Sequence, residues 1–216
     1  TDVLADLLWT PSPDGDENLR REGIPAGRIE RVGNIMLDSY ELQRQHIEAD
    51  GTFRQLGLEA RRYGVVTLHR PSNVDDPTTL RLLVEALGRV AADLPLVFPV
   101  HPRTRKNLSE FGLLDGLTAS PGVRLCEPKG YVQFMNLVSH AAMAITDSGG
   151  VQEETTYLGI PCLTLRENTE RPVTVIECTN RLLKPHMLMA EVSRVLDGDW
   201  SRGRRPDLWD GKTAGR

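Results

Sequence analysis

The sequence predicts an α/β fold built on a parallel β-sheet with helices on both of its faces. Between residues 63 and 165, short apolar segments alternate with segments of helical periodicity, which is the pattern of repeated β-α-β units. The apolar segments are almost unbroken by polar residues, as expected for strands covered on both faces. The stretch 145–171 places a strand, a glycine turn, a helix and a second strand in succession. Ligands of such sheets bind beyond the carboxyl ends of the strands.

The elements of this alternation follow one another in a regular order. One helix between successive strands makes each crossover right-handed and the sheet parallel. The expected strands are 63–68, 96–100, 123–126, 142–146 and 161–165, and the expected helices between them are 78–92, 103–111, 131–140 and 151–158.

The segments that flank the alternation look incomplete. The part before it has too few strands for a domain and too much order for a tail, so we expect the chain to be truncated at both ends. The expected flanking elements are a strand-like start at 1–8, a helix at 16–22, a strand at 28–32, a helix at 35–49, a helix at 188–196 and a loop at 197–206.

Composition excludes several classes of function. The net charge of the 216 residues is −4 and no long block of like charge occurs, which argues against nucleic acid or a membrane surface as the main partner. No apolar run approaches the roughly 20 residues of a transmembrane helix, and no signal peptide is visible, so we expect a cytoplasmic protein. The three cysteines are widely spaced and no histidine has zinc-site spacing, so we expect no structural metal.

The glycine turn has the chemistry of an anion site. Ser148, Gly149 and Gly150 lie where a helix is expected to begin, so free backbone N–H groups and the positive end of the helix dipole converge there. The two glycines let an anion approach the backbone without a Cβ in the way. Many glycine turns only connect elements, but the residues that follow favour a phosphorylated ligand.

Charged residues follow this turn in the helix and after the next strand. Glu153 and Glu154 fall in the first turn of the helix, where a carboxylate either favours the dipole or accepts two sugar hydroxyls. Arg166 and Arg171 bracket a loop after the second strand, where they would close over a charged ligand. These residues make a phosphorylated sugar ligand the favoured interpretation.

Polar side chains also follow two earlier strands. His69 and Arg70 come after the first strand of the alternation, and His101 comes after the second. With the glycine turn on the same edge of the sheet, they predict a cationic pocket suited to a diphosphate. Two alternatives are open: each histidine also fits a strand end bonded to backbone, and the basic residues at 103–106 also fit a solvated helix turn.

Phe134 has two interpretations that periodicity does not separate. It lies in the helix expected at 131–140, where an aromatic ring commonly packs into the core. If that helix begins at the ligand crevice, the ring instead stacks on a base, a contact of about 1–3 kcal/mol in nucleic-acid complexes.

Four motifs together resemble those of the non-hydrolysing UDP-N-acetylglucosamine 2-epimerases. Their order and spacing agree from about residue 8 to residue 183, which is most of the chain. The motifs are Thr-Leu-His-Arg-Pro-Ser-Asn-Val-Asp at 67–75, Pro-Val-His-Pro at 99–102, Thr-Asp-Ser-Gly-Gly-Val-Gln-Glu-Glu at 146–154 and Thr-Glu-Arg-Pro at 169–172.

The resemblance implies the architecture called GT-B, in which two Rossmann-like domains face each other across a cleft. By this resemblance, residues 1–50 are the end of the N-terminal domain and a connecting helix. Residues 51–198 are the Rossmann-like UDP-binding domain, and residues 199–216 begin a truncated C-terminal segment. The expected partners are UDP or UDP-N-acetylglucosamine, the missing N-terminal domain and, at full length, a second copy in a homodimer.

The resemblance also implies roles for individual residues. His69 would lie by the diphosphate and be important for activity. Arg70 and His101 match positions that bacterial members use for a second, regulatory UDP-N-acetylglucosamine. The expected UDP-binding residues are Ser148, Gly149 and Gly150 for phosphate, Glu154 for the ribose hydroxyls, Arg171 for the nucleotide and Phe134 for the uracil.

The reaction implied by the resemblance interconverts UDP-N-acetylglucosamine and UDP-N-acetylmannosamine. UDP is eliminated to leave 2-acetamidoglucal and is then added to the other face, without a cofactor, and the product supplies cell-surface polysaccharide synthesis. Carboxylates of the missing domain would supply acid and base groups, so the fragment alone is expected to be inactive. Alternatives are a GT-B glycosyltransferase, a hydrolysing epimerase or a non-catalytic nucleotide-sugar-binding module.

The chain departs from the family pattern at two turns. Cys178 stands where members usually have glycine, and Leu183-Lys184-Pro185 replaces a glycine-containing turn. Since glycine is favoured where φ is positive, these changes predict strain in the loop that closes over the nucleotide.

Overall fold

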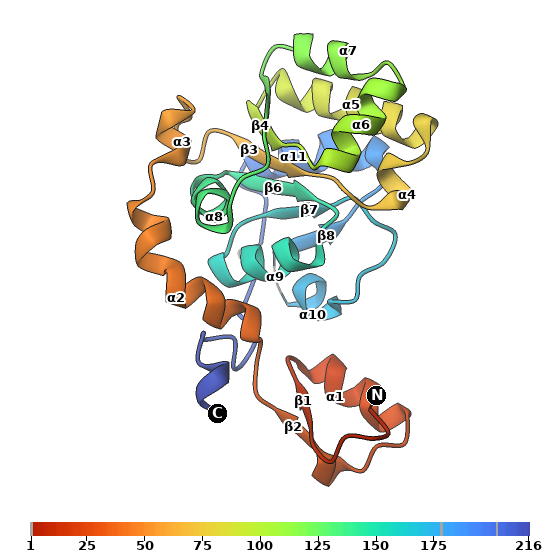
Figure 1. The fold of residues 1–216 in the computed structure, drawn as a ribbon, viewed down its shortest axis with the longest axis vertical. Helices are drawn as coiled ribbons and strands as arrows, with labels where there is room; N and C mark the ends of the chain where they lie inside the picture. The colour runs from red at the N-terminus through yellow and green to blue at the C-terminus, as the bar shows by residue number, and fades with distance from the viewer. Residues whose placement is uncertain (1, 178, 202) are drawn as a thin grey trace.

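The computed structural model describes residues 2–177, 179–201 and 203–216, so the predicted effect of Cys178 lies outside the described residues. Within this part of the chain, six parallel strands form one sheet in the order β5-β4-β3-β6-β7-β8 (Figure 1). This is the doubly wound order of Rossmann-like folds. The strands are β3 (Gly64–Thr67), β4 (Leu96–Pro99), β5 (Val123–Cys126), β6 (Met143–Thr146), β7 (Cys162–Thr164) and β8 (Asn180–Leu182).

The predicted parallel sheet is confirmed, but its last strand, β8, was not predicted from the sequence. All five neighbouring strand pairs among the described residues are parallel. Strand β8 is only three residues long and contains Asn180 and Arg181, so it lacks the apolar run that identifies the other strands. It forms because Asn180 pairs with Cys162 at the free edge of β7.

Helices cover both faces of the sheet, as predicted. The short helices were not predicted, because they have too few residues to show a period. The expectation of one helix between successive strands is wrong in two crossovers. Helix α4 precedes α5 between β3 and β4, and Gly112 (φ +66°) separates α6 from α7 between β4 and β5. The helices are α1 (Pro13–Arg21), α2 (Ile35–Ala49), α3 (Thr52–Gln55), α4 (Pro71–Val74), α5 (Pro77–Ala91), α6 (Pro102–Glu110), α7 (Leu114–Ala119), α8 (Tyr131–His140), α9 (Gly149–Leu158), α10 (Pro172–Ile176) and α11 (Leu188–Leu196).

Two apolar cores lie on the two faces of the sheet. Successive residues of β3 point to opposite faces, so Val66 packs in the core with α5 and α11 while Val65 packs in the core with α8. The helix α2 also packs its buried residues Leu37 and Ile47 into the α8 core. Burial of each such aliphatic side chain contributes about 1.5–3 kcal/mol to the stability of the fold, so packing on both faces stabilises the sheet.

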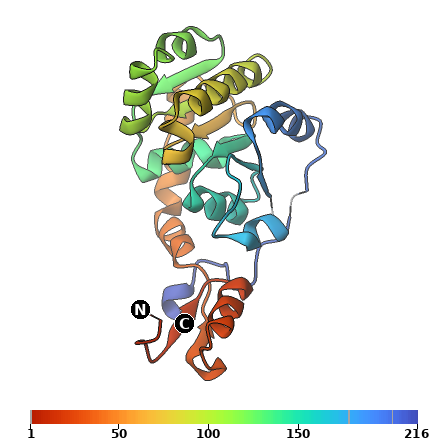
Figure 2. The same ribbon diagram turned by 90° about the vertical axis from the view of Figure 1, so that its right-hand side faces the viewer.

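The first residues of the chain form a small unit beside the sheet domain (Figures 1 and 2). Strand β1 (Leu8–Thr10) pairs in parallel with β2 (Ile29–Arg31), and α1 connects them. The expected strand-like start at 1–8 is wrong, because Val3 and Leu4 are exposed and the strand begins at Leu8.

The C-terminal segment returns to this unit and to α2. Trp209 is 1% exposed in the α8 core, and its indole N–H donates to the carbonyl of Pro11 (2.8 Å). Asp38 in α2 accepts backbone hydrogen bonds from Thr213 (3.0 Å) and Ala214 (2.7 Å), at the start of the 3₁₀ helix Thr213–Gly215. The predicted domain limits at 50 and 198 stay a prediction.

Lys184 does not produce the strain that its place in a glycine-type turn predicts. Its φ is −88° and its ψ is 155°, which is ordinary extended backbone. That part of the expected loop strain is therefore wrong. Among the described helices, none has the length and apolar character needed to cross a membrane.

Candidate functional site

Helix α9 begins directly after β6 and leaves its first N–H groups without a side-chain cap. Ser148 is the N-cap residue with extended backbone (φ −86°, ψ 131°), and its side chain makes no capping hydrogen bond. The Ser148 N–H donates to the hydroxyl of Thr146 (3.0 Å), which fixes the turn. A Cβ added at Gly149 would meet no other atom within 4 Å, so packing does not require glycine there. The open helix start provides the backbone donors and dipole that bind anions.

Asp147 lies next to this turn, and its role was not predicted from the sequence. Its side chain is fully buried. One carboxylate oxygen accepts hydrogen bonds from the backbone N–H groups of His69 (3.0 Å) and Arg70 (2.9 Å) and from the amide of Asn73 (3.1 Å). Burial alone would raise the pKa of Asp147, but these bonds and that from the His69 side chain lower it. The signal available in the sequence was an acidic residue immediately after a buried strand.

The same carboxylate orients His69. Its second oxygen lies 2.9 Å from Nδ1 of His69. Because Asp147 is held ionised, the Nδ1–H of His69 donates to it, which leaves Nε2 available to a ligand. This joins the carboxyl end of β3 to the start of α9. The residue expected by the diphosphate is thus fixed beside the anion site.

His69, His101 and Phe134 line one cavity of about 160 Å³ at the carboxyl ends of β3 and β4. The two imidazole centroids are 5.9 Å apart. Nδ1 of His101 accepts the backbone N–H of Arg103 (3.2 Å), so the backbone-bonded interpretation holds for His101 but not for the side chain of His69. Phe134 is half-buried, packing against the α8 core while also bordering this cavity.

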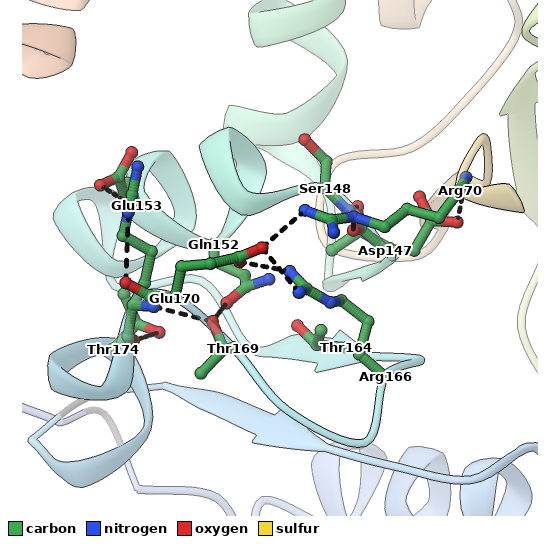
Figure 3. A network of polar contacts seen from close by, with 12 residues as sticks. Arg70, Asp147, Ser148, Gln152, Glu153, Thr164, Arg166, Thr169, Glu170 and Thr174 are labelled. Atoms are coloured by element: carbon green, nitrogen blue, oxygen red, sulfur yellow. Dashed lines mark hydrogen bonds and ion pairs between the residues drawn. The ribbon is translucent and has the colours of Figure 1, made fainter. Parts of the chain in front are cut away.

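Arg70 and Arg166 share the carboxylate of Glu170 across the sheet edge (Figure 3). Arg166 donates two hydrogen bonds to it (2.7 and 2.9 Å), and Arg70 donates one (3.2 Å). Hydrogen bonds from Arg166 are the main reason that the pKa of Glu170 falls to about 2. Arg70 also donates from Nε to the backbone carbonyl of Asp147 (3.1 Å), so its guanidinium lies next to the α9 turn.

Arg171 pairs with Glu153 rather than with Glu154. Its Nε lies 2.6 Å from Oε1 of Glu153, whose side chain is 4% exposed. Burial raises the pKa of Glu153 despite this partner. Thr169 positions the loop before Arg171 by donating to the amide oxygen of Gln152 in α9 (2.6 Å), as Figure 3 shows.

Glu154 lies more than one turn along α9 and is buried. Desolvation raises its pKa to about 7, and a hydrogen bond from the Tyr131 hydroxyl only partly offsets that effect. The predicted place of Glu153 and Glu154 in the first helical turn is wrong, because α9 already begins at Gly149, and the burial of Glu154 was not predicted. The basic side chains at 103–106 fit the solvated interpretation, since Arg103 pairs with Asp75 and Lys106 with Glu110.

The structure thus gathers most of the predicted residues along one edge. The ends of β3, β6 and β7 bring His69, Arg70, Ser148 and Gly149 together with the loop that carries Arg171. A larger cavity of about 750 Å³ lies at the opposite, amino-terminal edge beside Pro95, but parallel sheets bind ligands at the carboxyl ends of their strands. No group of metal-ligating side chains occurs among the described residues.

A doubly wound sheet with an open helix start and basic side chains on its carboxyl edge is the arrangement by which α/β proteins of the Rossmann-like class bind phosphorylated ligands. The sequence profile of the family described as UDP-N-acetylglucosamine 2-epimerase matches residues 1–216. The chain belongs to this family, whose named members are isomerases. The predicted resemblance is confirmed.

Relatives of known name share about half of their length with this chain. The UDP-N-acetylglucosamine 2-epimerase of Methanocaldococcus jannaschii is 38% identical over 181 residues, which are 81% of this chain and 49% of the relative. The UDP-2,3-diacetamido-2,3-dideoxy-D-glucuronate 2-epimerase of Pseudomonas aeruginosa is 35% identical over 187 residues, which are 85% of this chain and 49% of the relative. The chain therefore spans about half the length of the curated relatives that it matches.

Solved structures agree with the fold. The crystal structure of the Methanocaldococcus jannaschii UDP-GlcNAc 2-epimerase in complex with UDP-GlcNAc and UDP has a TM-score of 0.85 and 33% sequence identity. The match covers 100% of this chain and 61% of that one. The predicted Rossmann-like half of a GT-B architecture is confirmed. The likeness to the wall teichoic acid polymerase TagF, at 13% identity and a TM-score of 0.52, shows the fold alone.

Proposed function

We propose that this chain is the UDP-binding half of an enzyme that interconverts UDP-N-acetylglucosamine and UDP-N-acetylmannosamine for cell-surface polysaccharide. The observation that carries the proposal is the uncapped start of α9, held against His69 by the buried carboxylate of Asp147. Family membership and the UDP-GlcNAc and UDP in the solved relative support it.

The diphosphate binds at the start of α9 in this proposal. Backbone N–H groups of Gly149 and Gly150, with the Ser148 side chain, hold it, and the Nε2 of His69 faces it. Negative charge develops on the diphosphate as UDP leaves the sugar, and oriented donors stabilise that charge most strongly where water is excluded. This chain thus supplies stabilisation of the leaving group.

The nucleoside part extends toward α8. Phe134 stacks on the uracil, since its ring borders the cavity beside His69. Glu154 accepts hydrogen bonds from the ribose hydroxyls. Arg171 binds the nucleotide, and in doing so it gives up part of its contact with Glu153. Arg70 and His101 bind a second, regulatory UDP-N-acetylglucosamine. The Arg171 side chain is 42% exposed despite its contact with Glu153, which is consistent with its role.

The proposed function also requires groups from outside this chain. We propose an N-terminal domain that faces the carboxyl edge of the sheet and supplies acid and base carboxylates to the sugar. We further propose a cytoplasmic homodimer. The lengths of the relatives, about twice that of the matched part, support the two-domain proposal.

Calorimetric titration of this chain with UDP tests the proposal. UDP should bind, and uridine should bind more weakly because it lacks the diphosphate. Arg171→Ala and Glu154→Ala should each weaken UDP by about 1.5–3 kcal/mol, the usual contribution of a hydrogen bond to a charged group. Arg194→Ala, an exposed change on α11, is the control and should have no effect. Absence of UDP binding at millimolar concentration, or unchanged affinity in both site variants, would refute the proposal.

A further inference from the structure

Two of the four sequence motifs contain a polar residue to which the proposed function gives no role. Gln152 belongs to the motif at 146–154, and Thr169 opens the motif at 169–172. Gln152 is fully buried in α9, where an amide side chain is costly unless it makes hydrogen bonds. The two residues meet in the structure, since the Thr169 hydroxyl donates to the amide oxygen of Gln152 (2.6 Å; Figure 3). The contact joins the anion-binding helix to the loop that carries Arg171.

This contact is one side of a closed ring of hydrogen bonds around the backbone of Arg171. The Arg171 N–H donates to the Thr169 hydroxyl oxygen (3.0 Å), and the Arg171 carbonyl accepts from the Thr174 hydroxyl (2.7 Å). Asn180 in β8 closes the ring, because its NH₂ group donates to Thr174 (3.0 Å) and to Gln152 (3.1 Å). Each of the two hydroxyls donates once and accepts once, as its chemistry allows. The ring therefore connects α9, the loop and β8.

Most of the ring lies inside the protein. Gln152, Thr174 and Asn180 are all buried. Asn180 is also fixed from its other side, since its amide oxygen accepts a hydrogen bond from the Thr164 hydroxyl of β7 (2.6 Å). Water does not compete for buried bonds of this kind, and a fully paired polar network is rigid, so the loss of one member weakens the others.

Arg171 depends on the ring because no regular element fixes its backbone. Its φ of −128° and ψ of 58° belong neither to a helix nor to a strand, and α10 begins only at the next residue. Since the backbone sets the direction of a side chain, the ring determines where the guanidinium lies. That place is beside the buried Glu153, with Nε 2.6 Å from its carboxylate. A displacement of about 1 Å is enough to remove the effect of a charged group on a bound ligand, so the ring controls what Arg171 contributes.

We propose that Gln152, Thr169 and Asn180 are positioning residues for nucleotide binding and that they act through Arg171. In this proposal they do not touch the nucleotide. They hold the backbone of Arg171 so that its guanidinium reaches the ligand bound at the start of α9. The inference rests on the proposed function, in which Arg171 binds the nucleotide, and it adds the residues that make Arg171 effective.

A double-mutant cycle on the affinity for UDP, measured by calorimetry, tests the assignment. Thr169→Val removes the hydroxyl but keeps the shape of the side chain. It should weaken UDP about tenfold, the low end of what loss of a hydrogen bond to a charged group produces. In Arg171→Ala, the same change should weaken UDP less than about twofold, because the residue through which it acts is gone. Since Arg171→Ala leaves the Glu153 carboxylate unpaired, the cycle is repeated with Glu153→Gln added to that background.

Two further variants serve as controls. Thr169→Ser keeps the hydroxyl and should therefore retain most of the affinity for UDP. Thr118→Val removes an exposed hydroxyl that bonds within α7, and it should leave the affinity unchanged. Chemical denaturation of each variant measures any general loss of stability separately from the effect on binding.

The outcomes separate this inference from the proposed function. If Thr169→Val binds UDP within about twofold of the unchanged chain while Arg171→Ala weakens it, the positioning role is overturned and the UDP site stands. Equal weakening by Thr169→Val with and without the Arg171 side chain also overturns the positioning role, because the hydroxyl then acts by another route. If UDP does not bind, or if Arg171→Ala binds it unchanged, the proposed role of Arg171 fails and this inference fails with it.

Discussion

Replacing Asp147 by Asn should loosen the orientation of His69 and lower the free energy of unfolding. The buried carboxylate accepts bonds from two backbone N–H groups, from Asn73 and from Nδ1 of His69. An asparagine retains one oxygen, so its NH₂ group must face a donor on one side. Loss of one charged hydrogen bond and weakening of the others predicts a fall of about 3 kcal/mol in the free energy of unfolding. For a chain of this length, that corresponds to about 6–12 °C in melting temperature.

Chemical denaturation at a series of pH values measures this effect. The pKa of Asp147 is lower in the folded protein than in the unfolded chain. Its ionised form therefore stabilises the fold above the unfolded pKa of about 4, and this contribution is lost as pH falls through the folded pKa. The difference from Asp147→Asn should be largest at pH 7 and shrink toward pH 3. Asp75→Asn, whose carboxylate is exposed on the surface, is the matched control and should change the free energy of unfolding far less than Asp147→Asn does, because solvent screens an exposed ion pair. A variant at Asp147 within 0.5 kcal/mol of the unchanged chain, on the order of experimental scatter, would refute the reasoning.

Three further predictions concern the ligand and the buried acids. Gly149→Ala should leave the melting temperature unchanged or slightly higher, because the added Cβ meets no other atom. It should nevertheless weaken UDP binding, because the methyl group covers the start of the helix. An unchanged affinity for UDP by calorimetry would place the phosphate elsewhere. Arg171→Ala should destabilise the fold by about 3 kcal/mol because it leaves the buried Glu153 carboxylate unpaired, and adding Glu153→Gln should restore stability but not UDP affinity. Glu154 has a pKa raised to about 7, so the folded state holds its proton where the unfolded chain has lost it, and stability should decline as pH rises from about 5 to 8. Glu154→Gln should flatten that decline in a denaturation series, and an equal slope in both proteins would contradict the shift.

Much of the fold follows from local patterns in the sequence. The limits of α2, α8 and α11 agree with the predicted 35–49, 131–140 and 188–196 to the residue. These helices have clear caps or apolar stripes that do not depend on distant residues. The strands of the alternation were equally visible because burial on both faces leaves them nearly free of polar residues. The predicted start of α9 at residue 151 lies two residues after the observed start at Gly149, since Ser148-Gly149-Gly150 is a local signal.

The missing parts depend on contacts between distant residues. Strand β8 exists only because β7 offers a free edge, and three residues with two polar side chains show no period of their own. The place of Asp147 directly after a buried strand was the only local signal, and it did not reveal the partners of the carboxylate, because these donors follow β3, far away in the sequence. The pairing of Arg171 with Glu153 instead of a ligand likewise depends on how the loop meets α9. The roles predicted for the site residues stay predictions. The sequence named side chains that lie on one edge of the sheet, but it did not reveal Asp147, whose place depends on tertiary packing.

The return of the last residues to the start of α2 has a practical consequence for dissecting this protein. Trp209 fills the α8 core and donates a hydrogen bond to the carbonyl of Pro11, so residues 203–216 connect the small N-terminal unit to the sheet domain. Loss of a buried tryptophan side chain costs about 3–5 kcal/mol, a large share of the 5–15 kcal/mol that typically holds a domain together. A protein that ends at residue 198 should therefore be prone to aggregation and proteolysis. A version of the sheet domain made for ligand screening should keep the C-terminal segment that carries Trp209.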